Sequence, residues 1–304
     1  MTEQHDAAWK DFWADQGGTA RRTTGCLPER WHGIEEVQRG VWQGFAASLP
    51  RGAALLDLAT GNGKVMGWCL AKRRDLKPVG VDLAPHVPQP PRGAKVRPGT
   101  AMEKLPFPDG KFAAVVSQFG FEYGDVAQVA REIARVLTAD GVVALMTHRI
   151  DGPILAYNRQ RREQIRWVLD EKDLPAIAKR GLALRGMGLG PVPPPVAEAP
   201  AEGARLYGSD SAAWEIAEAI RRCLAMGARD HPANVSGLID TIVAKARNEV
   251  GRIDSLEQAC QTTDDADGLE SALSGAGLKE ISVTAVDEAR SDRAFADFRI
   301  IRRS

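Results

Sequence analysis

The segment Leu55–Val65 most constrains what this chain can fold into. It reads Leu-Leu-Asp-Leu-Ala-Thr-Gly-Asn-Gly-Lys-Val, so an apolar run ends in an acid and a glycine turn follows. The apolar density of Ala53–Leu58 predicts a strand buried on both faces, and Lys64–Lys72 predicts a helix. Gly61 and Gly63 then stand at the mouth of that helix, where unpaired N–H groups attract an anion and a ligand approaches the backbone closely.

The spacing of this turn separates two kinds of nucleotide site. A dinucleotide fingerprint reads GxGxxG, whereas here Asp57 is followed by Ala59, Thr60, Gly61 and Gly63. This order resembles the first motif of the class I S-adenosylmethionine-dependent methyltransferases, an acid followed by GxGxG, with Ala59 in place of the first glycine. The resemblance implies that the acid lies near the methionine amino group of the cofactor. It also implies that the turn lies under the methionine and ribose portions.

A second acid follows a second predicted strand. The short apolar segment Pro78–Ala84 predicts a buried strand that ends in Asp82. A carboxylate about twenty residues beyond a glycine turn can accept hydrogen bonds from both hydroxyls of a ribose. In the methyltransferases the second strand ends in such an acid, so the resemblance implies that Asp82 and its neighbour Leu83 bind the adenosine part of S-adenosylmethionine.

The segment Gly99–Phe112 resembles the family's linker between the third and fourth strands. That linker commonly carries an acid and an alanine ahead of Leu-Pro-Phe, and here Thr100 or Ala101 stands at the acid position. The adenine amino group would then meet a backbone carbonyl or Glu103 in place of the usual carboxylate. Met102 either lies against the adenine face or is a core residue.

The reacting end of the site is expected beyond the next strands, because ligands of open α/β sheets bind outside the carboxyl ends of strands. The strand Phe112–Gly120 carries Gln118, a candidate contact to the methionine end of the cofactor, and is followed by Glu122. His148 follows the predicted strand Val142–Thr147, where an imidazole can act as a base near neutral pH. We take His148 as the first candidate base and Glu122 as the second; a histidine without a catalytic role is the alternative.

The resemblance covers residues 51–150 and 266–304. It implies an α/β fold with a Rossmann-like, seven-stranded, mostly parallel sheet that ends in an antiparallel hairpin. Residues 1–50 predict N-terminal helices, and the family suggests that they form a lid. Residues 151–265 predict a helical insertion after the fifth strand, which would cap the site and form the acceptor pocket. Within it, the proline-rich stretch 186–203 predicts an extended linker or loop.

Two further features admit a structural and a functional interpretation. The N-terminal segment carries Trp13, Trp31 and His32, which either pack on the sheet or close over cofactor and acceptor. The predicted helix Gly152–Leu169 has a basic side made by Arg159, Arg161, Arg162 and Arg166. That side is either a solvated surface or a pocket for an acidic acceptor.

Composition limits the class of partner. The 304-residue chain has 40 basic and 40 acidic residues, whereas a nucleic-acid binder usually has a basic excess. No stretch approaches the ~20 apolar residues that span a bilayer, and the first residues lack the apolar region of a signal peptide. The four scattered cysteines form no CxxC pair, so neither a zinc site nor a disulfide framework is expected. We therefore expect a cytoplasmic protein without membrane, metal or nucleic-acid binding; the sequence does not fix its oligomeric state.

Together these motifs predict a methyltransferase that passes the methyl group of S-adenosylmethionine in line to a small-molecule acceptor. We expect alignment of the reactants to lower the activation barrier by about 7 to 11 kcal/mol. A general base typically raises the rate only about 10² to 10⁴-fold, so alignment is the larger contribution. A nicotinamide-dependent reductase is one alternative, although none of the three tyrosines has a lysine four residues later. A protein that binds S-adenosylmethionine without catalysis is the other. An RNA methyltransferase is disfavoured by the zero net charge.

Overall fold

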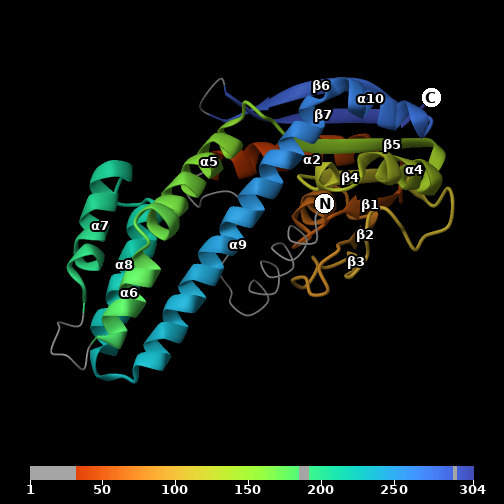
Figure 1. Ribbon diagram of the computed structural model, residues 1–304. Coiled ribbons are helices and arrows are strands. Elements are labelled where there is room, and N and C mark those ends of the chain that lie inside the picture. Colours follow the sequence, from red (N-terminus) through yellow and green to blue (C-terminus); the bar gives the residue numbers. More distant parts are fainter. Residues whose placement is uncertain (1–31, 185–191, 290–292) are drawn as a thin grey trace. The chain divides into compact units, whose positions relative to one another are not determined.

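The computed structural model describes residues 32–184, 192–289 and 293–304 (Figure 1). The chain divides into two compact units. The first comprises Met1–Leu155 and Ser255–Ser304, and the second comprises Ala156–Asp254. The chain passes from one unit into the other within helix α5 (Pro153–Arg166) and again within helix α9 (Pro232–Asp264).

The first unit is built on a seven-stranded sheet with the strand order β3-β2-β1-β4-β5-β7-β6. The strands are β1 (Ala54–Leu58), β2 (Lys77–Val81), β3 (Lys95–Arg97), β4 (Phe112–Gln118), β5 (Leu137–His148), β6 (Leu278–Asp287) and β7 (Ala294–Arg303). Strands β1 to β5 pair in parallel, whereas β7 is antiparallel to both β5 and β6. The predicted fold class is thereby confirmed. A dinucleotide-binding Rossmann sheet has the order 3-2-1-4-5-6, so the antiparallel β7 between β5 and β6 departs from it.

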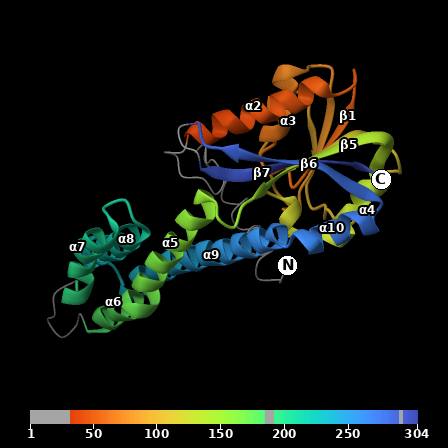
Figure 2. The ribbon, with the colours of Figure 1, turned by 90° about the horizontal axis from the view of Figure 1, so that it is seen from above.

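Helices cover both faces of this sheet, as Figure 2 shows. The flanking helices are α2 (His32–Ser48) and α3 (Lys64–Lys72) on one face and α4 (Val126–Val136) and α10 (Ala266–Gly275) on the other. Strand residues alternate between two buried clusters. On β1, Leu55 packs with residues of α2 and α3, whereas Leu56 and Leu58 pack with residues of α4 and α10. Burial on both faces explains why the central strands read as continuous apolar runs.

The N-terminal half of helix α2 lies near the carboxyl ends of the central strands. It ends at Ser48, and β1 begins at Ala54 after a short turn, so α2 runs back along the sheet, antiparallel to β1. In its first turn, Glu35 pairs with Lys64 Nζ at 3.1 Å. Lys64 begins α3, directly after β1 and its glycine turn, and therefore marks the carboxyl end of the strands.

The second unit consists of helices with a buried cluster of their own, which includes Val168, Ile220, Leu224 and Ile239. Its elements are most of α5, the π-helical turn η2 (Trp167–Glu171), α6 (Leu174–Ala183), α7 (Pro194–Tyr207), α8 (Ala212–Met226), the 3₁₀ turn η4 (Gly227–Arg229) and most of α9. The role of residues 151–265 in forming the acceptor pocket stays a prediction. So does the lid role of residues 1–50, because Trp13, Trp31 and the side chain of His32 lie outside the described residues.

The prediction of a linker or loop over residues 186–203 is wrong for its second half, because α7 begins at Pro194. A proline in the first turn lacks only an N–H that would be unpaired there anyway. Pro200 lies inside the helix, where a proline removes one backbone hydrogen bond, and it is buried. At Gly203 a Cβ would lie 3.2 Å from the backbone atoms of Ala213 and Trp214, so α7 and α8 approach closely. Residues 185–191 lie outside the description.

Two of the four arginines on the basic side of α5 form close ion pairs with carboxylates of α9. Arg161 donates to both carboxylate oxygens of Glu249, at 2.6 and 3.2 Å. Arg162 donates to Asp254 Oδ1 at 2.6 Å. These arginines join two helices of the second unit, and they therefore give no support to a pocket for an acidic acceptor.

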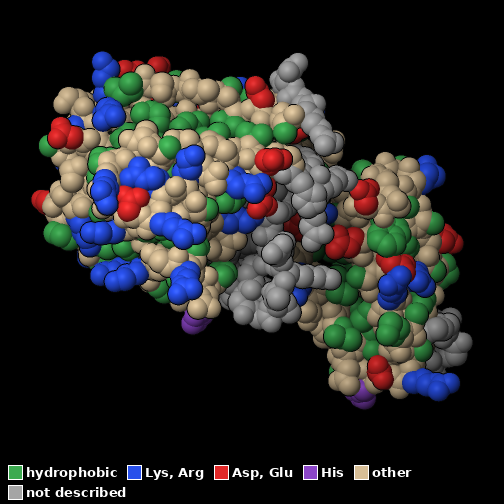
Figure 3. All heavy atoms as spheres, turned by 180° about the vertical axis from the view of Figure 1, so that it is seen from behind, with side chains coloured by type: hydrophobic (Ala, Val, Ile, Leu, Met, Phe, Trp, Pro, Cys, Tyr) green, Lys and Arg blue, Asp and Glu red, His purple; other side chains and the backbone are tan. Residues whose placement is uncertain are grey.

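Exposed cations gather on the surface of the first unit, and Figure 3 shows one face of the molecule on which Lys and Arg side chains cluster. The exposed cations between positions 72 and 111 are Lys72, Arg74, Lys77, Arg92, Lys95, Arg97, Lys104 and Lys111. Two of them, Lys95 and Arg97, lie on the edge strand β3, where charged side chains hinder pairing with another chain. The zero net charge of the whole chain therefore conceals a local excess of positive charge.

Candidate active site

The glycine turn and the second acid, which the sequence predicts as separate motifs, form one structure. The backbone N–H of Thr60 donates to Val81 O at 2.9 Å. The N–H of Gly61 donates to Asp82 Oδ2 at 2.8 Å, and the N–H of Ala84 donates to Oδ1 at 2.9 Å. Asp82 is buried, and burial raises its pKa while these two hydrogen bonds act in the opposite direction. Each carboxylate oxygen keeps a lone pair with which it can accept a ligand hydroxyl.

Ala59 takes a glycine-like conformation at the position where the family has its first glycine. Its φ is 51°, and the φ of Gly61 and Gly63 is 52° and 73°. Left-handed backbone costs a residue with a Cβ about 1–2 kcal/mol. The methyl group of Ala59 packs against Gly120, where a Cβ would lie only 2.5 Å from the Cβ of Ala59. The turns that follow β1 and β4 are therefore in direct contact.

Asp57, the acid at the end of β1, is 1% exposed. Its Oδ2 accepts a hydrogen bond from Thr60 Oγ1 at 2.5 Å. Burial raises the pKa of Asp57 to about 7, the Thr60 hydroxyl lowers it, and the nearby Asp82 adds to the rise. A positively charged ligand group would stabilise the ionised form of such a carboxyl group.

The residues predicted for the adenine side run beside Asp82. Gly99 and Thr100 donate backbone hydrogen bonds to Ala84 O at 3.0 Å and to Asp82 O at 2.8 Å. Further along this segment, Ala101 is half-buried, and Met102 is 9% exposed and packs in the cluster that contains α4. Leu83, which follows Asp82, is 37% exposed. Glu103 is engaged by the backbone N–H of Asp125 at 3.1 Å.

Gln118 ends β4 and is bound by an indole from α2. Its Oε1 accepts a hydrogen bond from Trp42 Nε1 at 2.6 Å. Trp42 is fully buried, and its apolar environment makes this polar contact a well-shielded one. Because the carbonyl oxygen faces the indole, the amide NH₂ of Gln118 is the end that remains to donate to a ligand. The sequence analysis did not predict this bond.

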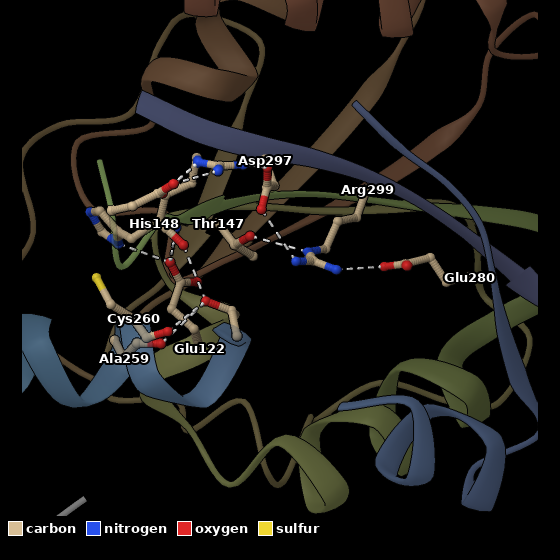
Figure 4. Close-up of polar contacts among 11 residues, drawn as sticks. Glu122, Thr147, His148, Ala259, Cys260, Glu280, Asp297 and Arg299 are labelled. Atoms are coloured by element: carbon tan, nitrogen blue, oxygen red, sulfur yellow. Dashed lines mark hydrogen bonds and ion pairs between the residues drawn. The ribbon is translucent and has the colours of Figure 1, made fainter. Parts of the chain in front are cut away.

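The two candidate bases, which the sequence offers as alternatives, contact each other (Figure 4). Glu122 lies in the 3₁₀ turn η1 (Phe121–Tyr123), and His148 ends β5. Glu122 Oε1 accepts hydrogen bonds from the backbone N–H of His148 at 3.0 Å and from its Nδ1 at 2.9 Å. A carboxylate beside Nδ1 selects the tautomer with its proton on Nδ1, which leaves Nε2 to accept a proton.

The imidazole of His148 lies between aromatic rings. It stacks on Phe119 with ring centroids 4.0 Å apart, and it meets the edge of Tyr123 at 6.0 Å. His148 and Glu122 are 4% and 2% exposed. The second carboxylate oxygen of Glu122 is buried and has no hydrogen-bond partner among the described residues. The pair is therefore shielded from bulk water, which strengthens its electrostatic interactions.

Residues far along the chain hold the end of β5 in position. The hydroxyl of Thr263, on α9, donates to His148 O at 3.1 Å. Arg299, on β7, donates from Nε to Thr147 Oγ1 at 3.3 Å and from a terminal nitrogen to Glu280 at 2.9 Å (Figure 4). Thr263 thus joins α9 to the strand that carries His148, and Arg299 joins the closing hairpin to it. No local sequence pattern predicts the contacts of Thr263 and Arg299 with β5, because their partners lie 115 and 152 positions away.

Part of the first unit matches a known family model. Residues 56–145 match the family model of the methyltransferase domain. No curated protein matches the sequence. The YcgJ protein of Bacillus subtilis is 23% identical, over 43% of this chain and 59% of that one, with a TM-score of 0.34. An S-adenosylmethionine-dependent methyltransferase of Mesorhizobium loti is 24% identical, over 36% and 54%, with a TM-score of 0.31.

A third solved structure, the geranyl diphosphate C-methyltransferase of Streptomyces coelicolor A3(2), is 14% identical, over 49% of this chain and 66% of that one, with a TM-score of 0.36. In all three comparisons the chain covers less than two thirds of the solved structure. The assignment therefore depends on the family model and on the strand order. Over residues 56–145, the chain is therefore similar to a methyltransferase domain.

Within the described ranges, no group of three or more His, Cys, Asp or Glu side chains is arranged to hold a metal ion. None of the helices that these ranges form has an apolar stretch long enough to cross a bilayer.

Proposed function

We propose that this protein transfers the methyl group of S-adenosylmethionine directly to a small-molecule acceptor. The observation that carries the proposal is the convergence of two features at the carboxyl ends of the strands. The glycine turn joined to Asp82 lies at the ends of β1 and β2, and the Glu122–His148 pair lies at the ends of β4 and β5. A cofactor site thus stands at the same edge of the sheet as an acid–base pair.

The residues of the turn fit the parts of the cofactor. Asp57 would bind the methionine ammonium, and the turn formed by Ala59, Thr60, Gly61 and Gly63 would lie under the methionine and ribose. The carboxylate of Asp82 and the neighbouring Leu83 would hold the ribose. Ala101 and Met102, beside Asp82, would border the adenine. The buried and unusually basic carboxyl group of Asp57 supports this fit, because an ammonium group would offset its desolvation.

The bound sulfonium supplies an electrophilic methyl group, so the protein has to align the acceptor and remove the proton that the acceptor loses. In the proposal, Gln118 contacts the methionine end, and His148 Nε2 takes the proton that the acceptor loses as its new bond to the methyl carbon forms. Glu122 holds the imidazole through Nδ1 and stabilises its protonated form. The pair is therefore a base with a fixed orientation, as direct in-line transfer requires.

The burial of this pair favours a small acceptor. His148 and Glu122 are almost completely shielded, so the reacting group has to reach into the interior of the domain. The ion pairs of Arg161 and Arg162 leave an acidic acceptor without the basic pocket that the sequence suggested. The chemical identity of the acceptor is the part of the proposal that a screen has to supply.

Calorimetry on ligand-stripped protein with S-adenosylmethionine and S-adenosylhomocysteine tests the cofactor. We expect both to bind, and the absence of heat from either would contradict the proposal. A panel of small nucleophilic acceptors, with S-adenosylhomocysteine release as the readout, tests the transfer. Binding without turnover across the panel favours a non-catalytic binding protein, and thermal stabilisation by NADPH alone favours the reductase.

A further inference from the structure

We propose that Gln38 binds the carboxylate at the amino-acid end of S-adenosylmethionine, together with Gln118. This inference rests on the proposed function and extends its cofactor site to helix α2. Gln38 is 3% exposed, and its Nε2 is buried without a hydrogen-bond partner among the described residues. Most buried polar groups in proteins are hydrogen-bonded. We therefore infer that this buried amide, which lies beside the proposed cofactor site, donates a hydrogen bond to the cofactor.

The position of Gln38 follows from its neighbours on the same helix. One turn earlier, Glu35 pairs with Lys64 at the start of α3, directly after the glycine turn. One turn later, Trp42 donates to Gln118 at the end of β4. Residues three and four positions apart lie on the same side of a helix. Gln38 therefore lies between the glycine turn and the end of β4, at the carboxyl edge of the sheet.

The chemistry at this position is that of a hydrogen-bond donor. The carbonyl oxygen of Gln118 is occupied by Trp42, so Gln118 offers its NH₂ group, and Gln38 has a buried Nε2 without a partner. Two amide donors suit a carboxylate, whereas the buried carboxyl group of Asp57 suits an ammonium. The ammonium group of the cofactor would thus bind Asp57, and its carboxylate would bind the amides of Gln38 and Gln118.

The experiment compares two ligands that differ in this end. S-adenosylhomocysteine carries the amino-acid group, and 5′-methylthioadenosine lacks it. Replacement Gln38→Met removes the donor and keeps the length of the side chain. We expect it to weaken binding of S-adenosylhomocysteine about tenfold to hundredfold, as the loss of a hydrogen bond to a charged group implies. Binding of 5′-methylthioadenosine should change less than about twofold.

Two further variants sharpen the comparison. Gln38→Asn retracts the amide by one methylene and should weaken S-adenosylhomocysteine only in part. Gln43→Met is the matched control, because Gln43 lies on the same helix and is half-buried; neither ligand should respond to it. Calorimetry gives the affinities, and thermal unfolding of the ligand-free variants reports whether α2 still packs. We expect Gln38→Met to keep or raise the melting temperature, since it removes an unpaired buried amide.

The outcomes separate this inference from the proposed function. If wild-type protein binds S-adenosylhomocysteine and Gln38→Met binds it equally well, the inference is wrong and the proposed function stands. Equal weakening of both ligands would assign Gln38 to helix packing and would also overturn it. If wild-type protein binds neither ligand, the proposed function itself fails.

Discussion

One oxygen of Glu122 accepts two hydrogen bonds from a single residue, the backbone N–H of His148 at 3.0 Å and its Nδ1 at 2.9 Å. The carboxylate therefore fixes both the position of the histidine backbone and the tautomer of its ring. The two residues are 26 positions apart: Glu122 follows β4, and His148 ends the neighbouring parallel strand β5. In the proposed reaction they act as one unit, and the first two predictions test that unit.

Replacement His148→Asn should lower turnover about 10² to 10⁴-fold, the usual contribution of a general base. The affinity for S-adenosylhomocysteine should stay within about twofold, because His148 is proposed to face the acceptor. Steady-state rates with an acceptor from the panel and calorimetry on the same preparation check both parts. Wild-type turnover in this variant would remove His148 from the mechanism.

Replacement Glu122→Gln should lower turnover about tenfold to hundredfold, since an amide is a weaker partner for a protonated imidazole than a carboxylate is. The KM for S-adenosylmethionine should not change. A double variant with His148→Asn provides the control. If Glu122 acts through His148, adding Glu122→Gln to His148→Asn lowers the rate no further. Losses that simply multiply would mean that the two residues act independently.

Binding of S-adenosylhomocysteine should tighten as the pH rises through 7. Burial raises the pKa of Asp57 from 3.8 to about 7, and a bound ammonium would favour the ionised form and so release a proton. About a tenth of the free protein is ionised at Asp57 at pH 6 and about nine tenths at pH 8, which predicts about tenfold tighter binding at pH 8. Calorimetry in buffers of different ionisation enthalpy would also detect the released proton.

The control is Asp57→Asn, which should bind the ligand weakly and with little dependence on pH.

Between pH 4 and 7 the folded protein holds a proton on Asp57 that the unfolded chain has lost, so the contribution of Asp57 to the free energy of unfolding falls as the pH rises. The ligand-free Asn variant should therefore gain stability over wild type at pH 8 and little at pH 4. Denaturant unfolding at the two pH values measures this. Equal effects at both would contradict the assignment to Asp57.

Replacement Ala59→Gly should raise the free energy of unfolding by up to about 1 kcal/mol, because glycine adopts the left-handed φ of 51° without strain. Gly120→Ala should cost about 1–3 kcal/mol, since its new Cβ would lie 2.5 Å from the Cβ of Ala59. The double variant should recover part of that loss. Chemical denaturation of all four proteins gives the coupling, and strictly additive effects would show that the two turns do not touch.

Replacement Asp82→Asn should weaken S-adenosylhomocysteine and 5′-methylthioadenosine alike, by about tenfold or more. Both ligands contain the ribose, and the amide presents an NH₂ group toward either Gly61 N–H or Ala84 N–H, where the carboxylate accepts at 2.8 and 2.9 Å. The equal response of both ligands distinguishes this residue from Gln38. Unchanged affinity for 5′-methylthioadenosine would exclude Asp82 from the adenosine site.

The order of the elements in the methyltransferase domain could be predicted from the sequence. The apolar run Leu55–Leu58, the glycine turn and the helix Lys64–Lys72 are local patterns, and the structure has β1 and α3 at these positions. The closing hairpin also appears as predicted, with β6 and β7 antiparallel. Such patterns succeed because the period of apolar residues reflects which backbone conformation buries them.

The same reasoning failed where packing overrode local preference. Prolines predicted a linker over 186–203, yet α7 forms from Pro194 because Gly203 lets it pack closely on α8. For the arginines of α5 the sequence left a solvated surface and a pocket open, and the structure pairs Arg161 and Arg162 with carboxylates on α9. These carboxylates lie about ninety positions away in the chain.

By itself, the sequence determined the sheet-and-turn framework and the acids that end β1 and β2. Only the tertiary structure decided that Glu122 and His148 form a pair, that Trp42 fixes the amide of Gln118, and that Gln38 is buried without a partner. The reason is physical: a hydrogen bond that joins residues 26 or 76 positions apart depends on how strands and helices pack, whereas periodicity in a sequence reports only the local backbone.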